Sequence, residues 1–599
     1  MRKSIFSAFL LLSCSFVFAQ QTKDIDSITI HGKILNTPYA KVSENMEVIT
    51  RKDIENSPAQ SIDEVLQQYS GMDIRRRGAN GVQSDVSIRG GSFDQVLILL
   101  NGVRMNDSQT GHNSLNIPVD LASVERIEII KGPAARRFGQ NAYAGAINII
   151  TKTSGEESAR ISAEGGDFSS YALGLSSTFG SENFTNLFQV STNSSDGYRH
   201  NTDYEIRNVY YQNKFALQNG SIGLQAGFSE KKFGANGFYS SPNATEQYEE
   251  MQASIVSVQY EQRFQKWNIH SNVNWRRGQD MYLYNREKPE IYRNMHIGNN
   301  FGTEVNANYA SSLGVTGFGA EFRKEFLASN NLGNQDRLIS QLFFEHRFSL
   351  LSDRLQIIPG ISWADFSNAG NYFYPGLDVG FDFNEHHKIY GNIAKVNRVP
   401  TFTDLYYLSR TESGNVNLQP ENAVSSEVGY QFKKRNWMVK ASVFMRDTDN
   451  MIDWIKNNDA ELWTAENIAQ VKTKGFETEV QIPVDAIHTN INLSYTYLDN
   501  SFEIPYEFSK YVAENLRHQF IAKLENRFLK YFSNQLTYRY LERVSTGKYQ
   551  LLDEKLTFKK GNFETYLLVN NLTNTDYTEV FGVPMPGRWF HLGVAFTLK

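Results

Sequence analysis

His386 and His387 stand side by side, and adjacent histidines are residue types that could do metal chemistry. A protein site for a metal ion needs three or four convergent ligands. The pair follows Asn384 and Glu385 between two runs of alternating apolar residues, which is the pattern of a short hairpin turn. We therefore expect a turn at this position, and we predict no resident metal and no cofactor.

The sequence patterns of common enzymes are missing from this chain. It contains no phosphate-binding loop, no GxSxG nucleophile elbow and no HExxH zinc motif. Cys14 is the only cysteine, and it lies in an apolar leader. If that leader is removed, the mature chain has no thiol for a disulfide, a zinc–thiolate site or a nucleophile. These observations predict that the protein is not an enzyme and has no catalytic residues.

The composition is typical of a folded, strand-rich protein. Of the 599 residues, 40% are hydrophobic, 21% are charged and 13% are aromatic, including 31 Tyr and 40 Phe. Aromatic side chains favour strands, and disordered chains contain few of them. The net charge of −5 is modest and no Lys/Arg-rich run suggests nucleic acid, so we expect no nucleic-acid partner. The length indicates two domains or one very large barrel.

Residues 1–19 have the pattern of a secretory signal peptide. Two basic residues, Arg2 and Lys3, precede an apolar stretch, and Ala19 ends a small-residue cleavage site. The alternative is a lipoprotein leader with lipidation at Cys14, but it leaves the apolar residues after that cysteine without a role. We therefore predict export of the chain with its leader removed.

From about Gly155 to the end of the chain, apolar and polar residues alternate with a period of two. The short alternating segments are separated by polar turns, and the clearest of them start at Tyr171, Trp267, Ile491 and Phe590. Beyond the leader, no apolar run reaches the roughly 18 residues that a membrane-spanning helix requires. If this chain resides in a membrane, it must therefore do so as a closed barrel.

The alternation indicates a β-barrel in a membrane rather than a soluble sandwich. Both folds pair an apolar face with a polar face, but here the pattern continues over some 445 residues without an evident second core. Trp267 and Trp275 also stand at segment ends, where a membrane barrel carries its interfacial girdles. With spans of about 10 residues plus connections, residues 154–599 predict an all-β transmembrane barrel of about 22 antiparallel strands.

Residues 36–153 differ in kind from the barrel region. They hold three short apolar runs with many glycines between them, at 96–100, 124–130 and 146–150. Ser61 and Glu64 form a capping-box pattern that predicts the start of a short amphipathic helix. This is the pattern of a small α+β domain. A barrel of about 22 strands has a lumen that such a domain could fill as a plug.

Several fragments, in order and at matching spacing, resemble the signature of TonB-dependent outer-membrane receptors. In the first domain they are residues 88–90, 100–104, 124–133 (VERIEIIKGP), 138–139 and 145–152 (GAINIITK). In the barrel they are residues 397–401 (NRVPT), 415–421 (NVNLQPE), 474–477 (KGFE), 570–572 and 587–588. The resemblance covers the whole chain. It implies a barrel in the outer membrane, surrounded by lipid, with an N-terminal plug in its lumen and active import of a scarce small-molecule nutrient.

The same resemblance implies that TonB, the energy-transducing protein of the inner membrane, binds near the mature N-terminus and pulls the plug. Residues 20–35 are the expected TonB-interacting region, and the candidate segment is Asp26, Ser27, Ile28, Thr29 and Ile30. An extended, β-branched stretch can pair with the edge of a partner's sheet. The alternative is a disordered leader that contains Ile-Thr-Ile by chance.

By resemblance, plug residues 75–84 and 106–116 face outward. They offer hydrogen-bond donors for a polar or anionic nutrient, and the substrate-binding candidates are Arg76, Arg77, Gln83, Asn106, Gln109, His112 and Asn113. The alternative is that several of them only bond to the barrel wall. Inside the lumen, guanidinium groups can pair with barrel carboxylates and hold the plug until it is pulled. We expect this role for Arg89, Arg104 and Arg126.

The size of the chain resembles the cobalamin and ferric-siderophore members of this family, and the residues do not decide between these ligands. Haem members carry a histidine between the two barrel motifs, and residues 402–414 contain none, which disfavours haem. Two alternatives are a passive porin, which would lack the plug, and a surface binding protein anchored by its barrel. The chain ends in Leu598 and Lys599 instead of an aromatic residue, although Leu598 keeps the outward phase.

Overall fold

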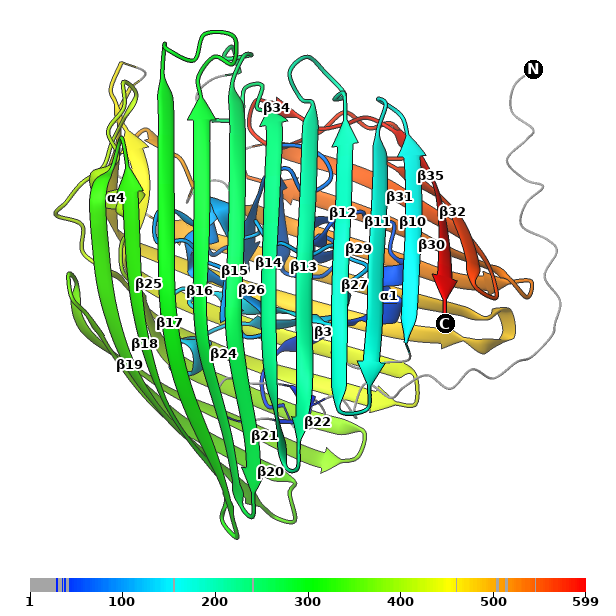
Figure 1. Ribbon diagram of the computed structural model, residues 1–599. Coiled ribbons are helices and arrows are strands. Elements are labelled where there is room, and N and C mark those ends of the chain that lie inside the picture. The colour runs from blue at the N-terminus through cyan, green and yellow to red at the C-terminus, as the bar shows by residue number, and fades with distance from the viewer. Residues whose placement is uncertain are drawn as a thin grey trace.

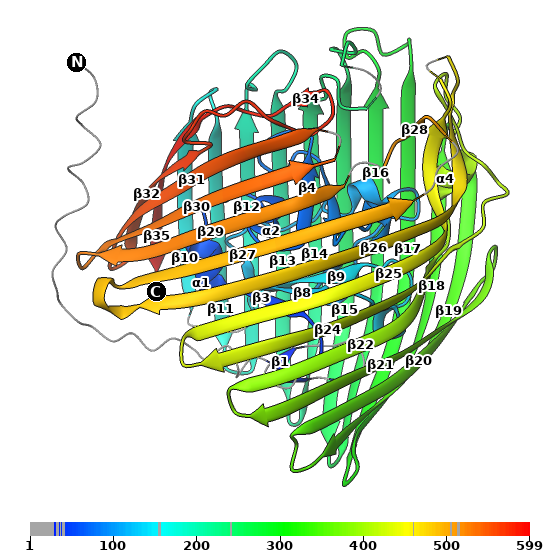
Figure 2. The ribbon, with the colours of Figure 1, turned by 180° about the vertical axis from the view of Figure 1, so that it is seen from behind.

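The computed structural model describes residues 29–30, 35, 37–38, 42–153, 157–239, 242–458, 460–502, 506–511, 515–544 and 546–599. The predicted signal peptide, with Cys14, and Asp26, Ser27 and Ile28 of the predicted TonB segment lie outside these residues. Thr29 and Ile30 form β1 (Thr29–Ile30), which pairs with β2 (Thr37–Pro38). Figures 1 and 2 show long strands that form a closed wall and a smaller group of elements inside it.

Within the described residues, twenty-two long antiparallel strands close into one barrel, which confirms the predicted fold class. Each strand pairs with the next, and the last strand pairs with the first, so the sheet has no free edge. The strands are β10 (Ser158–Gly166), β11 (Tyr171–Ser181), β12 (Phe184–Ser195), β13 (Tyr204–Leu217), β14 (Gly220–Gly234), β15 (Tyr248–Phe264), β16 (Trp267–Leu283), β17 (Arg293–Ser311), β18 (Gly314–Ser329), β19 (Gly333–Leu350), β20 (Leu355–Phe366), β21 (Gly370–Asn384), β22 (His387–Arg398), β24 (Glu421–Lys434), β25 (Trp437–Lys456), β26 (Trp463–Val484), β27 (Thr489–Phe502), β29 (Leu516–Phe528), β30 (Phe532–Arg543), β31 (Gly547–Lys560), β32 (Phe563–Asn570) and β35 (Trp589–Leu598).

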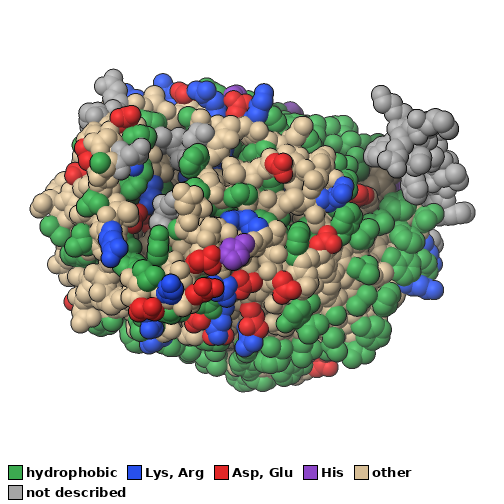
Figure 3. Space-filling model, turned by 90° about the horizontal axis from the view of Figure 1, so that it is seen from above, with side chains coloured by type: hydrophobic (Ala, Val, Ile, Leu, Met, Phe, Trp, Pro, Cys, Tyr) green, Lys and Arg blue, Asp and Glu red, His purple; other side chains and the backbone are tan. Residues whose placement is uncertain are grey.

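The outward face of the barrel is apolar because every second side chain of a strand points away from the lumen. On β35, Phe590, Leu592 and Leu598 are exposed, whereas His591 between them is buried. His591 packs inside, as expected, and its ring stacks on Trp589. Hydrophobic side chains cover much of the outer wall in the space-filling view of Figure 3. This surface matches the hydrocarbon region of a bilayer.

The two tryptophans of β16 differ in their positions. Trp267 begins the strand, and its ring centroid lies 4.8 Å from that of Tyr309, as expected for an interfacial girdle. The segment end predicted at Trp275 was wrong, because this residue lies within the strand, where its Nε1 donates to Asn299. The strand is longer than the predicted segment because it continues to Leu283, beyond the span that a bilayer needs.

The two ends of the barrel differ in the length of their connections. At the end where the C-terminus lies, turns of two to four residues join the strands; we call it the short-turn end. At the opposite, long-loop end, the longest connections are residues 235–247, 399–420, 503–515 and 571–588. They carry β23 (Glu412–Ser413), α4 (Phe402–Tyr406), β28 (Phe508–Ser509), β33 (Thr578–Val580) and β34 (Val583–Pro584). In outer-membrane barrels the short turns face the periplasm and the long loops face outside.

His386 lies in one of the short turns, as predicted. The turn joins β21 to β22, whose residues Asn384 and His387 face each other across the ladder. The backbone N–H groups of both histidines donate to the Asn384 side chain, which closes the turn. Among the described residues, no group of three or more potential ligands is placed to hold a metal ion.

The plug lies inside the barrel and is built around a five-stranded sheet with the order β3-β8-β9-β6-β7. Its strands are β3 (Met46–Thr50), β4 (Met72–Arg76), β5 (Ser84–Ile88), β6 (Val96–Leu100), β7 (Val103–Arg104), β8 (Val124–Lys131) and β9 (Gly145–Thr151). Its helices are α1 (Arg51–Asn56), α2 (Ile62–Leu66) and α3 (Ala135–Phe138), with the 3-10 turns η3 (Phe93–Gln95) and η4 (Gly111–Asn113). The three predicted apolar runs are β6, β8 and β9. Of the helices in the described part of the chain, none is long and apolar enough to span a membrane.

The helix α2 begins after Ser61, as predicted, but it lacks the predicted capping box. The Ser61 side chain makes no cap hydrogen bond. The Glu64 carboxylate accepts from the backbone N–H of Gln60 at 2.9 Å and pairs with Arg76 Nη1 at 2.9 Å. A charge-assisted bond to a guanidinium is stronger than a neutral cap, so the pair with Arg76 determines where this carboxylate lies.

Candidate functional site

Arg89 ties the plug to the barrel through buried ion pairs. Its Nη2 atom lies 2.9 Å from Glu427 Oε1 on β24 and 3.0 Å from Glu477 Oε2 on β26. The guanidinium also stacks 4.1 Å from the ring centroid of Phe444. The ring requires Gly475 in the KGFE fragment, because a Cβ there would lie 2.2 Å from Phe444 Cζ. The predicted tether at Arg89 is therefore confirmed.

The other two predicted tethers have different outcomes. Arg104 Nε lies 3.3 Å from Glu321 Oε1 on β18, which confirms a contact with the barrel. Arg126 instead pairs with Glu128 of its own strand at 2.7 Å, so the prediction for Arg126 was wrong. Residues two apart in a strand lie on the same face, which brings these two side chains together within the plug.

Two adjacent arginines of α3 form a further tether that the sequence analysis missed. Arg136 Nε lies 2.9 Å from Glu345 Oε2 on β19, and Arg137 Nε lies 3.0 Å from the same atom. Both guanidinium groups also contact Asp378 on β21. The only signal was their position before the family fragment at 138–139. Gly139 of that fragment has a φ of 77°, and a Cβ there would lie 2.2 Å from Gln341 Oε1.

The tethers are distributed unevenly around the barrel. Ion pairs reach the plug from β16, β18, β19, β21, β22, β24, β25, β26, β29 and β30. Between described residues, no ion pair joins the plug to β10–β15. Hydrogen bonds occur there instead, such as those from Asn101 to Tyr210 and Gln225. A cavity of about 250 Å³ also lies between the plug and the strands β10–β14, β31 and β32.

The two barrel motifs at 397–401 and 415–421 meet in a buried charge cluster. Arg398 lies 2.8 Å from Glu421, 3.2 Å from Asp404 and 3.6 Å from Asp94 of the plug. Gln95 Nε2 donates to Glu421 at 2.7 Å. Burial raises the pKa of Asp94 to about 6, with Arg398 opposing and Asp404 adding to the rise. The paired motifs thus hold the loop 399–420 against η3 of the plug.

A cavity lies between the plug and the long loops at the long-loop end. Its lining combines aromatic, acidic and basic side chains, among them Arg75, Asp85, Phe93, Asp94, His112, Arg398, Asp404, Trp454 and Tyr511. Figure 3 views the molecule from this end, and it shows a histidine among acidic and basic side chains in the middle of the face. Its volume is about 40 Å³, so it is a small recess whose rings and polar groups are available to one part of a ligand.

His112 is the predicted substrate residue that lines this cavity. Its Nδ1 atom lies 2.5 Å from Asp85 Oδ1, and its ring stacks on Phe93 with centroids 3.9 Å apart. Arg77 Nη1 approaches Asp85 Oδ2 at 2.6 Å. Burial alone would raise the pKa of Asp85, but Arg77 and His112 hold it well below its usual range. Asp85 is therefore a carboxylate that orients the imidazole.

The other predicted substrate residues lie behind or beside the cavity wall. Arg77 Nη1 donates to Gln83 Oε1, and Asn106 bonds to the backbone of Val96 and Ile98, which holds the loop after β7 on β6. Gln109 and Asn113 are buried as well; the Gln109 carbonyl accepts from the backbone N–H of Thr403 at 3.1 Å. A direct contact between these side chains and a substrate stays a prediction.

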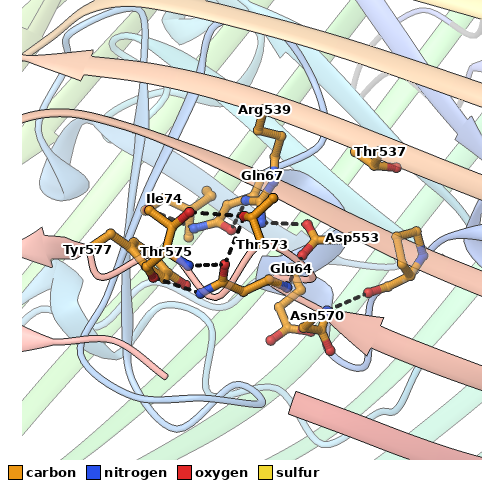
Figure 4. Close-up of polar contacts among 12 residues, drawn as sticks. Glu64, Gln67, Ile74, Thr537, Arg539, Asp553, Asn570, Thr573, Thr575 and Tyr577 are labelled. Carbon is orange, nitrogen blue, oxygen red and sulfur yellow. Dashed lines mark hydrogen bonds and ion pairs between the residues drawn. The ribbon is translucent and has the colours of Figure 1, made fainter. Parts of the chain in front are cut away.

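Arg76 lies in a second polar contact, between the plug and the loop 571–588. Its Nη2 atom lies 2.8 Å from Glu579 Oε1. Gln67 of the plug donates to Glu579 and accepts from Arg539 Nη1 of β30 at 2.6 Å. Figure 4 shows Gln67 and Arg539 pointing toward each other, with Asp553 beside them. Asp553 accepts from Arg539 Nη2 at 2.8 Å. Arg76 thus connects the plug to a long loop.

Most of the cavity lining was not found from the sequence. Phe93 follows the matched fragment at 88–90 closely, and this position was its only signal. Trp454 lies near the end of the long strand β25, and Tyr511 belongs to the loop 503–515. No local pattern marks these two residues, because the closure of the barrel brings them to the plug.

Family models match both parts of the chain. The model described as "TonB dependent receptor-like, beta-barrel" matches residues 136–591, and the model described as "TonB-dependent Receptor Plug Domain" matches residues 38–146. The chain is 25% identical over 635 residues to the vitamin B12 transporter BtuB of Vibrio vulnificus (strain CMCP6), with 100% of each chain covered. It is 22% identical to the BtuB of Vibrio cholerae (strain M66-2), with 98% of each chain covered.

Solved structures share the fold. The siderophore receptor PirA from Acinetobacter baumannii has a TM-score of 0.78 at 16% identity, covering 94% of this chain and 99% of that one. The FrpB iron transporter from Neisseria meningitidis has a TM-score of 0.78 at 15% identity, covering 92% and 99%. At these identities the likeness is one of architecture.

Proposed function

Because the chain belongs to the TonB-dependent receptor family, we propose that it imports a cobalamin-type corrinoid across the outer membrane, driven by TonB. The observation that carries the proposal is a lumen filled by a plug that buried ion pairs hold in place, below a cavity framed by long loops. A passive porin needs an open lumen, so the plug argues against that alternative. Members of this family are receptors and transporters, and we expect no catalysis by this chain.

The charges around the cavity favour a corrinoid over a highly anionic ferric siderophore. Two arginines line the cavity, and both are already paired: Arg75 with Asp73, and Arg398 with Glu421. The remaining lining includes carboxylates and the rings of Phe93, Trp454 and Tyr511. A polyanion would meet like charge there, whereas a flat macrocycle with amide side chains would meet rings and hydrogen-bonding groups. The name of the curated relatives, vitamin B12 transporter, supports the same ligand class.

The topology of the plug suits a pull from the N-terminus. We assign residues 20–35 to the TonB-facing region, with Asp26–Ile30 as the grip, and residues 36–153 to the plug. The region leads into β3, which is an edge strand of the plug sheet. Pulling on β3 from Met46 separates its hydrogen bonds to β8 one pair after another, beginning at Ile130. An edge strand can leave a sheet in this way at a lower force than a central strand.

Contacts of β3 and of the residue before it with the barrel wall oppose this release. Lys440 Nζ lies 3.4 Å from Glu47 Oε2 of β3, and Asn45, just before β3, donates to Glu427 at 3.2 Å. Along the wall β10–β15 hydrogen bonds take the place of ion pairs between described residues, and the cavity lies against β10–β14. We therefore assign the passage of the corrinoid to the β10–β15 side of the lumen.

The ligand class is tested by growth. A strain that lacks this protein is supplied with cobalamin or with iron at limiting concentration, with and without the wild-type chain. We expect the wild-type chain to restore growth on limiting cobalamin and to make no difference on limiting iron. Restored growth on a ferric siderophore alone would overturn the corrinoid assignment and keep the importer.

A further inference from the structure

We propose that the small recess at the long-loop end binds one primary-amide arm of the cargo, while the macrocycle stays outside it among the long loops. The inference rests on the proposed function, because it takes an amide-bearing corrinoid as the cargo. It deepens that function by naming the chemical group that the plug recognises. It starts from the size of the recess and from the polar groups in its wall.

The size of the recess fits a small group and excludes a macrocycle. Its volume is about 40 Å³. One water molecule needs about 10–15 Å³ of such a volume, so the recess has room for about three non-hydrogen atoms. A carboxamide group has this size. A corrinoid carries such groups at the ends of short, flexible arms around its rim, so one arm can enter while the ring remains outside.

Three residues in the wall keep polar atoms without a partner. Arg75 uses its Nε in the ion pair within β4, and among the described residues its two Nη groups form no hydrogen bond. Asp94 Oδ1 accepts from the backbone N–H of Gly111 at 2.6 Å, but its Oδ2 lies 3.6 Å from Arg398 Nη1, beyond hydrogen-bond distance. Trp454 Nε1 likewise has no partner within the described part of the chain.

These unpaired groups lie in a nearly enclosed place. The side chain of Arg75 is 12% exposed and that of Asp94 is 10% exposed, and both line the recess. A buried polar group without a partner costs free energy until a ligand or a water molecule pairs with it. The wall therefore offers N–H donors and one carboxylate acceptor to whatever enters.

A primary amide matches this set of donors and acceptors. Its carbonyl oxygen can accept from Arg75 or Trp454, and its NH₂ group can donate to Asp94 Oδ2. A carboxylate of the same size has no proton to donate and brings a like charge to Asp94. An ammonium group has no oxygen to accept from the guanidinium. The neutral amide is thus the small group that pairs with both kinds of wall atom.

Aromatic rings from two parts of the chain complete the wall. Phe93 belongs to the plug and Tyr511 to the loop 503–515, and their rings meet edge to face with centroids 5.1 Å apart. Flat apolar walls leave room for a planar group and keep bulk water away from it. Hydrogen bonds are electrostatically stronger in such a low-dielectric place, which favours selection by the polar atoms of the wall.

The proposal is tested by titration calorimetry of the purified, full-length receptor with cobalamin and with its isomeric monocarboxylic acids. In each isomer one amide arm is hydrolysed to a carboxylate, and the macrocycle and its metal are unchanged. We expect one isomer to bind the wild type about tenfold or more weakly than cobalamin, because its carboxylate would face Asp94 in an enclosed place. The other isomers should bind as cobalamin does, since their altered arms stay outside the recess.

Variants at Asp94 make the result specific. Asp94→Asn and Asp94→Ser remove the charge and keep an oxygen that can accept from Gly111, and in both we expect the difference between cobalamin and the weak isomer to disappear. The result is a ratio of two affinities on the same protein, so a general loss of stability cancels. Glu246→Gln is the matched control, because it makes the same change in an outer loop, where Glu246 pairs with His200. It should keep the full difference.

The failures are distinguishable. If every isomer binds the wild type as tightly as cobalamin, or all are weakened equally, the recess does not select an amide arm and the proposed function stands. A weak isomer that stays equally weak in both Asp94 variants also overturns the inference. If the wild type binds no corrinoid at all, the proposed function fails together with it.

Discussion

At the scale of single residues, the account depends on buried charges that are paired across the interface between plug and barrel. Arg89, Glu427 and Glu477 form such a group, and each of their side chains is less than 5% exposed. Removing one partner from a buried ion pair typically costs about 3–5 kcal/mol, because the other charge stays buried and uncompensated. The plug is therefore more sensitive to these residues than to charges on the surface.

The substitution Arg89→Ala should loosen the plug. It leaves Glu427 and Glu477 without their guanidinium, and we expect a loss of about 3–5 kcal/mol in the stability of the docked plug. The measurement is thermal unfolding of the purified receptor, together with the entry of a large antibiotic into cells. Arg207→Ala is the control, because Arg207 forms an exposed pair with Glu205, and we expect no change. Equal behaviour of the two variants would contradict the tether.

Glu47 should make the docking of β3 depend on pH. Burial raises the pKa of Glu47 from 4.5 to about 7, and the nearby Glu479 adds to the rise. A carboxyl group with a raised pKa in the folded state contributes stability that is present below the unfolded pKa and is lost as the pH rises through the folded value. We expect the melting temperature of the wild type to fall between pH 5.5 and pH 8 relative to that of Glu47→Gln. Parallel changes in both proteins would exclude this role.

The sequence predicted some of the site and missed the rest for a physical reason. His112, Arg89 and Arg104 were found because the family fragments place them at outward loops or in the lumen. Trp454 and Tyr511 were missed, because their proximity to the plug arises from the closure of the barrel and not from local spacing. Where several charges compete for one partner, as around Arg76, the sequence does not show which pair will form.

At the scale of elements, the period of two was a reliable signal because each strand has one face toward lipid and one toward the lumen. It located the barrel, and three apolar runs located β6, β8 and β9 of the plug. The predictions that failed concern details within elements: the capping box at Ser61, the position of Trp275 and the partner of Arg126. The capping box and the Arg126 pair depend on side-chain partners that the tertiary structure determines, and the position of Trp275 depends on where β16 ends.

The stability that the barrel loses when an arginine is placed on its outer face should depend on how deep in the bilayer that residue lies. Val273 lies within β16 and is 60% exposed, on the face that we assign to the membrane. Val273→Arg should destabilise the barrel by about 2–4 kcal/mol, as expected for a cation near the bilayer midplane. Leu351→Arg is the matched control, because Leu351 is 65% exposed in a short turn, where the cost falls to about 0–1 kcal/mol.

Unfolding and refolding of both variants in lipid vesicles measures this difference. If Val273→Arg and Leu351→Arg lose the same stability, β16 does not face the hydrocarbon at Val273, and the placement of the membrane on the barrel is wrong.

At the scale of the whole molecule, the plug is fastened unevenly. Ion pairs hold it to β16–β30 at many points, whereas hydrogen bonds and a cavity lie along β10–β15. The N-terminal region leads into the edge strand β3, so a force applied there begins to separate the sheet at its margin. These features support our proposal of a receptor that is closed at rest and opens when TonB pulls on its N-terminal region.

The most direct test of this account is the uptake of radiolabelled cobalamin by cells that carry either the wild-type chain or a chain lacking Asp26–Ile30. Uptake is measured with and without a protonophore that collapses the proton-motive force. We predict that both chains bind cobalamin at the cell surface, but that only the wild type accumulates it, and only while the proton-motive force is present. Equal accumulation through the shortened chain, or accumulation that persists with the protonophore, would contradict an importer driven by TonB.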